Sequence, residues 1–234
     1  MPIVLMDMPI LHTSETPNIY IPGLGRPGGD EHTAGAPGGD PQWVRGYSDE
    51  DVALLPDLPA DHTRARIWQA RKASGRRLVE YLAVSKKPLS ILEVGCGNGW
   101  LSRQMSAIPG HKVLALDRDL TVLRQAARVF RGQSNLKFMC GDFYSDIMTG
   151  LTFDTIVFAA SVQYFPSLNE VLGACLLRLK EKGEIHILDT PIRRRDLRIF
   201  KYRYLFNPRS FYNILTGKSR HSPWIRVTNY RLNR

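Results

Sequence analysis

The 234-residue sequence predicts an α/β fold, a doubly wound and mostly parallel sheet with helices on both faces. Two observations predict it. Five short apolar segments alternate with longer stretches in which apolar residues recur at helical spacing, and the first segment runs directly into three alternate glycines. Short buried strands alternating with helices are typical of right-handed βαβ units in a parallel sheet.

The strands are expected at residues 90–94, 112–116, 136–140, 153–160 and 184–188. After Ser90 the first is apolar except for Glu93, which suits a strand buried in the middle of a parallel sheet. The helices are expected at residues 64–83, 100–107, 120–130 and 168–179.

The sequence divides into an N-terminal arm, an α/β core that binds the ligand, and a basic and aromatic C-terminal extension that completes the sheet, at residues 1–60, 61–190 and 191–234. Residues 22–41 hold four prolines and seven glycines, which favours a mobile loop and leaves an active-site lid as the alternative. Residues 48–59 are acidic and interrupted by prolines, so a connector is expected there. For residues 1–21, a short strand and a covering segment both remain open.

The net charge of +10 is concentrated in one part of the sequence. Residues 190–234 carry twelve Lys and Arg against one acidic residue, whereas the preceding 189 residues carry 20 basic and 21 acidic groups. Residues 193–212 interleave seven basic residues with six aromatic ones. This pattern fits a basic helix packed on the sheet, which we favour, or a segment that binds nucleic acid.

The cysteines Cys96, Cys140 and Cys175 form no CxxC pair, and no histidine cluster has metal-ligand spacing. We therefore expect a reduced compartment with neither disulfides nor a metal site. The first eleven residues are apolar but interrupted by Asp7 and two prolines, and no basic stretch precedes them. They are too short to span a bilayer and make a poor signal peptide, so we expect a cytoplasmic protein without a membrane partner. The sequence does not predict the oligomeric state.

Acidic residues stand at the carboxyl ends of the first three strands: Glu93, Asp117 and Asp142, at intervals of 24 and 25 residues. Because ligands of such sheets bind beyond the carboxyl ends of the strands, these residues are expected at one ligand site. A carboxylate at Asp117 suits the two hydroxyls of a ribose. The alternative role for an acid after a strand is to cap the next helix.

The pattern Glu93-x-Gly95-x-Gly97-x-Gly99 resembles the first motif of the class I (Rossmann-like) S-adenosylmethionine-dependent methyltransferases, and among them the small single-domain bacterial type. The resemblance covers about residues 64–190. It implies a methyltransferase with S-adenosylmethionine as cofactor and S-adenosylhomocysteine as product. The family usually ends its sheet with two further strands, one of them antiparallel. Here only residues 224–230 are clearly strand-like, so the closing strands are expected to be shortened.

The resemblance also implies a set of cofactor-binding residues. In the family, the acid that matches Asp117 binds the ribose, the acid that matches Asp142 accepts from the adenine amino group, and Phe143 is placed to stack on the ring. The full set implied here is Glu93, Gly95, Cys96, Gly97, Asp117, Arg118, Asp142, Phe143 and Ala159. Cys96 is also expected to be a packing residue.

The expected reaction is in-line methyl transfer to a small-molecule acceptor, for which the basic C-terminal segment offers a subsite if the acceptor is acidic. Two alternatives remain: a methyltransferase that docks RNA or protein through that segment, and a non-catalytic protein of the same fold that binds nucleosides or nucleic acid. The sequence does not decide whether a general base is used.

Ser161, Gln163 and Tyr164, in the loop after the fourth strand, are the candidates to orient the acceptor, with packing against the next helix as the alternative. His186 is expected to be a core histidine, and His62 a candidate lid residue. In the helix before the first strand, Trp68 is expected in the core and Arg71 in solvent, with cofactor contact as the alternative for both.

Overall fold

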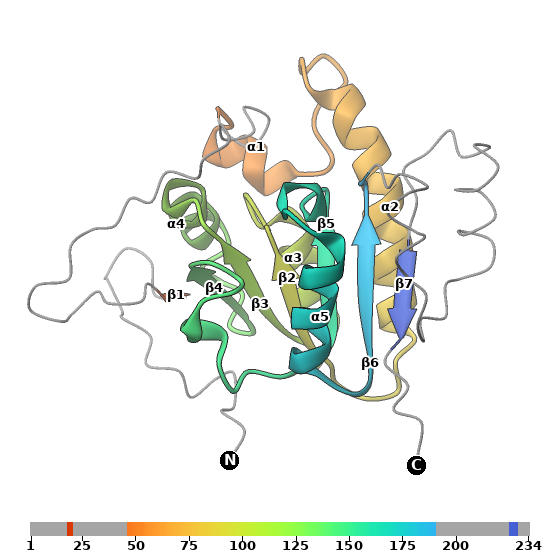
Figure 1. The fold of residues 1–234 in the computed structure, drawn as a ribbon. Helices are drawn as coiled ribbons and strands as arrows, with labels where there is room; N and C mark the ends of the chain where they lie inside the picture. Colours follow the sequence, from red (N-terminus) through yellow and green to blue (C-terminus); the bar gives the residue numbers. More distant parts are fainter. Residues whose placement is uncertain (1–17, 21–45, 191–224, 229–234) are drawn as a thin grey trace, which may run out of the picture.

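The computed structural model describes residues 18–20, 46–190 and 225–228, and in these ranges a sheet lies between helices on both faces (Figure 1). The sheet order is β1-β4-β3-β2-β5-β6-β7. All neighbouring strands are parallel except β6 and β7, which are antiparallel. The strands are β1 Ile19–Tyr20, β2 Ser90–Val94, β3 Lys112–Asp117, β4 Leu136–Cys140, β5 Phe153–Ala159, β6 Leu179–Leu188 and β7 Ile225–Thr228. The predicted doubly wound parallel sheet is confirmed, and its strand order reverses between β2 and β5.

Five helices and two 3₁₀ turns complete the described part: α1 Asp49–Leu54, α2 Ala65–Ala83, α3 Trp100–Ser106, α4 Leu120–Val129, α5 Leu168–Arg178, η1 Asp146–Met148 and η2 Val162–Tyr164. Helices α2, α3 and α4 cover one face of the sheet, and α5 covers the other (Figure 1). Side chains alternate along β2. Ile91 packs in the apolar core under α2, α3 and α4, the first core, and Leu92 packs in the apolar core under α5, the second core. The two apolar cores therefore lie on opposite faces of the sheet.

Most predicted elements agree with the structure to within a residue or two, but β6 begins at Leu179, five residues before the predicted start. The register between β5 and β6 shifts between Phe153 and Thr155, and Lys182 has a φ of 60°. The early part of β6 is thus irregular. Because its residues are mostly polar, the apolar pattern used to predict strands does not extend to it.

The prediction that residues 48–59 form a connector is wrong, because they contain helix α1. The Ser48 hydroxyl accepts from the Asp51 N–H at 3.0 Å, and the Asp51 carboxylate accepts from the Ser48 N–H at 3.1 Å. This capping box begins the helix, and its acidic first turn favours the helix dipole. Val52 and Leu55 are buried in the first core. The acidic residues taken as a sign of a connector are those that start the helix.

Each edge of the sheet carries a short strand. Ile19–Tyr20 pairs with β4, so a short strand forms within residues 1–21, and Ile225–Thr228 pairs with β6 as the antiparallel strand expected near residues 224–230. The predicted loop at residues 22–41 and the predicted basic helix at 193–212 lie outside the described residues. Within the described ranges, no helix is both long and apolar enough to cross a membrane.

Candidate functional site

The glycine turn between β2 and α3 lies at the carboxyl edge of the sheet, toward α1 and the start of α2 (Figure 1). Gly95 and Gly99 have φ values of 73° and 72°. A Cβ at Gly95 would lie 2.5 Å from the Ser161 Cβ, and one at Gly99 would lie 2.8 Å from the Phe138 ring. Both positions therefore need glycine, for their backbone conformation and for their close packing.

Glu93 supports this turn from inside the protein. Its side chain is buried and accepts a hydrogen bond from the Ser102 hydroxyl on α3. Burial raises its pKa to about 8, the Asp117 charge adds to that rise, and the Ser102 hydrogen bond opposes it. At neutral pH this carboxyl group is therefore mostly protonated, and it links β2 to the helix that follows the turn.

Asp117, at the end of β3, fixes the centre of the glycine turn. Its Oδ2 accepts from the Gly97 N–H at 2.7 Å, and its Oδ1 accepts from the Asp119 N–H at 3.0 Å. Burial raises its pKa, and hydrogen bonds from the backbone work in the opposite direction. A carboxylate has about four acceptor sites, so Asp117 can accept a further hydrogen bond from a ribose hydroxyl.

Arg118 and Asp142 join the ends of β3 and β4 at the surface. Arg118 Nη1 lies 3.6 Å from Asp142 Oδ2, and Asp142 Oδ1 accepts from the Tyr144 N–H at 2.8 Å. The Asp142 side chain is 42% exposed. The structure thus brings Asp117, Arg118 and Asp142 to one edge, as the sequence predicts, with Asp142 accessible to a ligand.

Phe143, the candidate for stacking on adenine, lies in the core. It is 2% exposed, and its ring meets Phe158 and Phe165 at centroid distances of 6.1 and 6.2 Å. The Arg178 guanidinium lies 5.0 Å from the same ring. The prediction that Phe143 stacks on adenine is therefore wrong, because its side chain packs in the core against Phe158 and Phe165.

Cys96 and Ala159 flank the turn without offering a polar group to a ligand. Cys96 is buried, and burial raises the pKa of its thiol well above the ordinary value, which fits a packing residue. Ala159 ends β5 and is partly exposed. Ala160 follows it with a φ of 54°, an unusual conformation for a residue with a side chain.

Two of the three residues predicted to orient the acceptor form hydrogen bonds with other protein groups instead. The Ser161 hydroxyl is buried and donates to the Val94 carbonyl at 2.6 Å. The Gln163 amide donates to the Ala160 carbonyl at 2.6 Å and accepts from the Thr190 hydroxyl at 2.9 Å. Tyr164 is 59% exposed and Gln163 is exposed as well, so these two of the three residues are accessible to a ligand.

The start of α2 and the segment before it cover this edge with aromatic residues. Trp68 is buried as predicted, donates to the Tyr47 hydroxyl at 2.7 Å, and packs edge-on against Trp100 at 5.2 Å. His62, the candidate lid residue, stacks on Tyr47 at 6.2 Å. Arg71 is partly buried and not solvated as expected, and this burial lowers the pKa of its guanidinium.

His186 lies inside β6, two strands away from Glu93 in the sheet. It is fully buried, its Nε2 lies 3.3 Å from Glu184 Oε2, and burial lowers its pKa. The prediction of a core histidine is confirmed.

Three polar residues at the carboxyl edge were missed from the sequence. Asp189 directly follows β6 with a φ of 55°, and the Ser74 hydroxyl lies 2.8 and 2.7 Å from its two carboxylate oxygens. In the glycine turn, the buried Asn98 amide nitrogen has no hydrogen-bond partner among the described residues. The signal for Asp189 was available, because it is an acid at or just beyond the end of a strand, as are Asp117 and Asp142.

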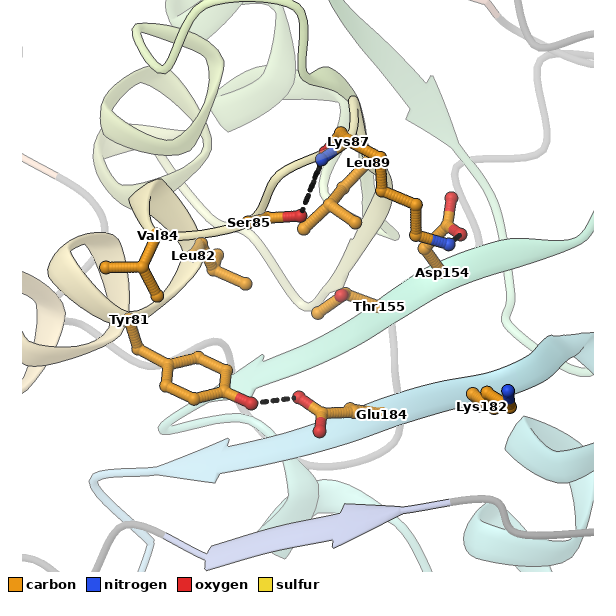
Figure 2. A pocket seen from close by; sticks show the side chains of 10 residues that line it. All are labelled: Tyr81, Leu82, Val84, Ser85, Lys87, Leu89, Asp154, Thr155, Lys182 and Glu184. Atoms are coloured by element: carbon orange, nitrogen blue, oxygen red, sulfur yellow. Dashed lines mark hydrogen bonds and ion pairs between the residues drawn. The ribbon is translucent and has the colours of Figure 1, made fainter.

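A separate pocket of about 220 Å³ lies at the opposite edge of the sheet, where the strands begin (Figure 2). Its lining includes Tyr81 from α2, Asp154 from β5 and Glu184 from β6. Lys87 reaches from the loop before β2 to Asp154, with the Nζ atom 3.1 Å from Oδ1. Because the glycine turn lies at the other ends of these strands, this pocket is distinct from the site built around Asp117.

The comparison with protein families identifies the core. Residues 91–183 match a family model described as a methyltransferase domain. Over these residues the chain is similar to methyltransferase domains. The matched residues run from β2 through the glycine turn into β6. They include Asp117 and Asp142 but not Ser74 or Asp189.

Curated relatives include a malonyl-(acyl-carrier protein) O-methyltransferase from Halalkalibacterium halodurans, which is 27% identical over 131 residues, 52% of this chain and 48% of that protein. A second of the same name, from Priestia megaterium, is 24% identical over 118 residues, 49% of this chain and 42% of that protein. The chain thus spans about half the length, or less, of these curated relatives.

Solved structures with a similar fold include a precorrin-6y C5,15-methyltransferase from Geobacter metallireducens, with 18% identity, a TM-score of 0.49, and coverage of 70% of this chain and 82% of that chain. Another is the N-methyltransferase NodS from Bradyrhizobium japonicum, with 16% identity, a TM-score of 0.48, and coverage of 70% and 98%.

Proposed function

We propose that the methyltransferase domain transfers a methyl group from S-adenosylmethionine to a small-molecule acceptor by in-line displacement, with S-adenosylhomocysteine as the second product. The observation that carries this proposal is the geometry of Asp117. It holds the glycine turn through the Gly97 N–H, and its two carboxylate oxygens together offer about four acceptor sites, more than the backbone N–H groups occupy. That arrangement suits a ribose lying across the turn, and the family match favours S-adenosylmethionine over other nucleosides.

The neighbouring residues fit the rest of such a cofactor. Asp142 is exposed beside Arg118 and can accept from an adenine amino group. The unpartnered Asn98 amide nitrogen is a donor inside the turn itself. When bound, the cofactor supplies an electrophilic methyl group on a sulfonium. The protein then has to bind it, orient the acceptor in line with the methyl group, and exclude water.

The curated relatives are named malonyl-(acyl-carrier protein) O-methyltransferases, which supports methyl transfer to an oxygen atom. The alternative of an RNA-docking enzyme depends on residues 193–212, which lie outside the described ranges.

Calorimetry with S-adenosylmethionine and S-adenosylhomocysteine tests the proposal, using Asp117→Asn and the matched variant Asp154→Asn at the opposite edge. We expect both ligands to bind the wild type and Asp117→Asn to lose roughly 1–3 kcal/mol, about 5- to 150-fold in affinity, because a charged acceptor of the ribose is removed. Asp154→Asn should bind as the wild type does.

Asparagine retains one acceptor for the backbone at position 117, and a thermal melt shows whether the variant is folded. The proposal fails if neither ligand binds the wild type, if NAD or an RNA oligomer binds instead, or if a folded Asp117→Asn binds as tightly as the wild type.

A further inference from the structure

Asp189 is a carboxyl group at the functional edge that the proposed cofactor contacts leave unused. It follows β6, and the neighbouring strand β5 ends in register beside it, with Ala159 opposite Leu188. The Ala160 N–H donates to the Leu188 carbonyl at 2.8 Å, so the residues that follow the two strands are held together. Asp189 therefore stands one strand away from the loop at Ser161–Tyr164, on the side of the sheet covered by α2.

Helix α2 connects Asp189 to the glycine turn. The Ser74 hydroxyl donates to the Asp189 carboxylate, and the next residue, Gly75, packs so closely on Trp100 that a Cβ there would lie 2.6 Å from the indole ring. Trp100 begins α3 directly after the turn. The carboxylate, the helix and the turn thus form one continuous packed unit.

The surroundings of Asp189 set its charge. Burial raises its pKa, whereas the Ser74 hydrogen bond and the charges of Arg71 and Arg77 lower it. Arg71 is affected in turn by Asp189 and by the hydroxyl groups of Tyr47 and Tyr164. The residue after Asp189, Thr190, donates through its hydroxyl to the Gln163 side-chain oxygen at 2.9 Å, so the chain directly after Asp189 contacts the acceptor loop.

Backbone conformation also distinguishes this position. Asp189 and Ala160 both have φ values near 55° and directly follow adjacent strands. Residues with side chains adopt this conformation at a cost of about 1 kcal/mol or more, and such residues concentrate at functional sites. A residue that only connects the end of β6 to α2 does not need to be an acid in this conformation.

We propose that Asp189 lines the acceptor subsite and takes the proton of an acceptor whose nucleophile is a hydroxyl or an amine. This inference rests on the proposed function, because it places Asp189 on the acceptor side of a bound S-adenosylmethionine. Ser74 and Arg71 are positioning residues that orient the carboxylate.

The step balances without a further reactant. A lone pair of the acceptor oxygen or nitrogen forms a bond to the methyl carbon, and the carbon–sulfur bond breaks with its electron pair going to sulfur. The sulfonium becomes the neutral thioether of S-adenosylhomocysteine. The proton of the acceptor passes to the Asp189 carboxylate and from there to solvent. A free carboxylate acceptor would have no proton to give and would meet a like charge.

The position of Asp189 can be tested without knowing the acceptor. Sinefungin carries a protonated amine where S-adenosylmethionine has its methyl group, whereas S-adenosylhomocysteine has no charge there. If Asp189 faces this position, the wild type binds sinefungin more tightly than S-adenosylhomocysteine. Asp189→Asn should reduce that preference about 10-fold and leave S-adenosylhomocysteine affinity unchanged, because only a nearby charge is removed. Calorimetry with both ligands measures the ratio.

Two control variants separate this role from a structural one. Ser74→Ala removes the hydrogen bond but keeps the carboxylate, so it should lower the melting temperature and largely keep the sinefungin preference. Glu80→Gln removes an exposed carboxylate from the same helix and should change neither quantity. If Asp189→Asn lowers the melting temperature and leaves the preference intact, Asp189 is only a tie between α2 and β6, and the inference fails.

The acceptor class is tested with a radiolabelled methyl group and a pool of alcohols, phenols, amines and carboxylic acids. We expect label in hydroxyl or amine products and a loss of about 10²- to 10⁴-fold in rate with Asp189→Asn. Label in carboxylic esters, at a rate unaffected by Asp189→Asn, overturns the inference. If no member of the pool is labelled, the sinefungin ratio decides. Absence of binding by S-adenosylhomocysteine is a different failure, since it removes the proposed function itself.

Discussion

At the carboxyl edge of the sheet, Glu93, Asp117 and Asp189 are carboxyl groups whose pKa values are raised by burial. At the amino edge, Asp154 and Glu184 are also partly buried, yet their pKa values are lowered by the partners that surround them. The same side-chain type is thus used in opposite ways at the two ends of the same strands.

The amino edge pairs its carboxylates with cations and donors. Asp154 lies 3.1 Å from the Lys87 amine and 2.8 Å from that of Lys180, and it accepts from the Ser90 N–H at 2.9 Å. These contacts join the loop before β2, the start of β2 and the early part of β6 to the start of β5. An acid placed in this way stabilises the fold.

The carboxyl edge instead supplies hydrogen bonds from the backbone and from hydroxyl groups. Asp117 binds two backbone N–H groups, and Glu93 and Asp189 each accept from a serine hydroxyl. Burying a carboxyl group costs stability, and here the hydrogen bonds, together with the charges of Arg71 and Arg77 at Asp189, offset that cost only in part, since the pKa values remain raised. Such groups concentrate where a ligand is bound or a proton is moved, which is the use proposed for Asp117 and Asp189.

Glu93→Gln should produce the largest effect. The folded-state pKa of Glu93 is about 8, against 4.5 for an ordinary glutamate. Its stabilising contribution is therefore fully present below pH 4.5 and is lost as the pH rises through about 8. Glutamine does not titrate. The free energy of unfolding of the variant, taken relative to that of the wild type, should therefore rise by roughly 3–5 kcal/mol from pH 5 to pH 9.

Urea denaturation at pH 5, 7 and 9 measures this difference, and Glu80→Gln, an exposed site on α2, provides the matched control. If the difference in unfolding free energy between Glu93→Gln and the wild type is the same at all three pH values, Glu93 does not titrate as a buried acid. The contrast between the two edges would then lose its strongest support.

Asp154→Asn tests the other edge and should have the opposite pH dependence. The pKa of Asp154 is lowered in the folded state, so its contribution is present above the ordinary value of 3.8 and is lost as the pH falls through the folded pKa. At pH 7 we expect a loss of roughly 1–2 kcal/mol, because both lysines are partly exposed and their attraction is screened.

Chemical denaturation at pH 7 and at pH 2 tests this, with Lys180→Met as a partner variant. The difference from the wild type should shrink at the lower pH and in 1 M salt. A difference that stays constant at both pH values would show that Asp154 acts through its shape or its Ser90 hydrogen bond rather than through its charge.

The fold was largely predictable because its signals are local and repeated. Apolar runs mark β2, β3, β4 and β5, and glycine or aspartate identifies the turns that follow the first three. Helix α1 was not predictable in this way. Its stability comes from tertiary contacts, such as Val52 in the core and Arg128 of α4 donating to Asp49 at 2.7 Å. A short acidic segment does not reveal such contacts.

The sequence predicted at which edge of the sheet the site lies, but not the directions in which its side chains point. Position after a strand was enough to place Asp117 and Asp142 together. It did not reveal that Phe143 turns into the core, or that the Ser161 hydroxyl is taken by the Val94 carbonyl. It also did not reveal that Ser74, nine residues into α2, reaches Asp189, because the two are 115 residues apart in the sequence.

Tyr81→Phe should have the smallest effect and tests whether the two edges are independent. The Tyr81 hydroxyl donates to Glu184 Oε2 at 2.8 Å and accepts from Arg226 Nη1 at 2.6 Å, so it ties the end of α2 to β6 and β7. Its removal should lower the free energy of unfolding by about 1 kcal/mol and leave S-adenosylhomocysteine affinity unchanged. Calorimetry and urea denaturation of the same preparation measure both. Helix α2 spans both edges, with Trp68 and Ser74 at one end and Tyr81 at the other. A loss of affinity in this variant would therefore mean that the amino edge helps to position α2 over the glycine turn, and the two edges would have to be treated as one coupled unit.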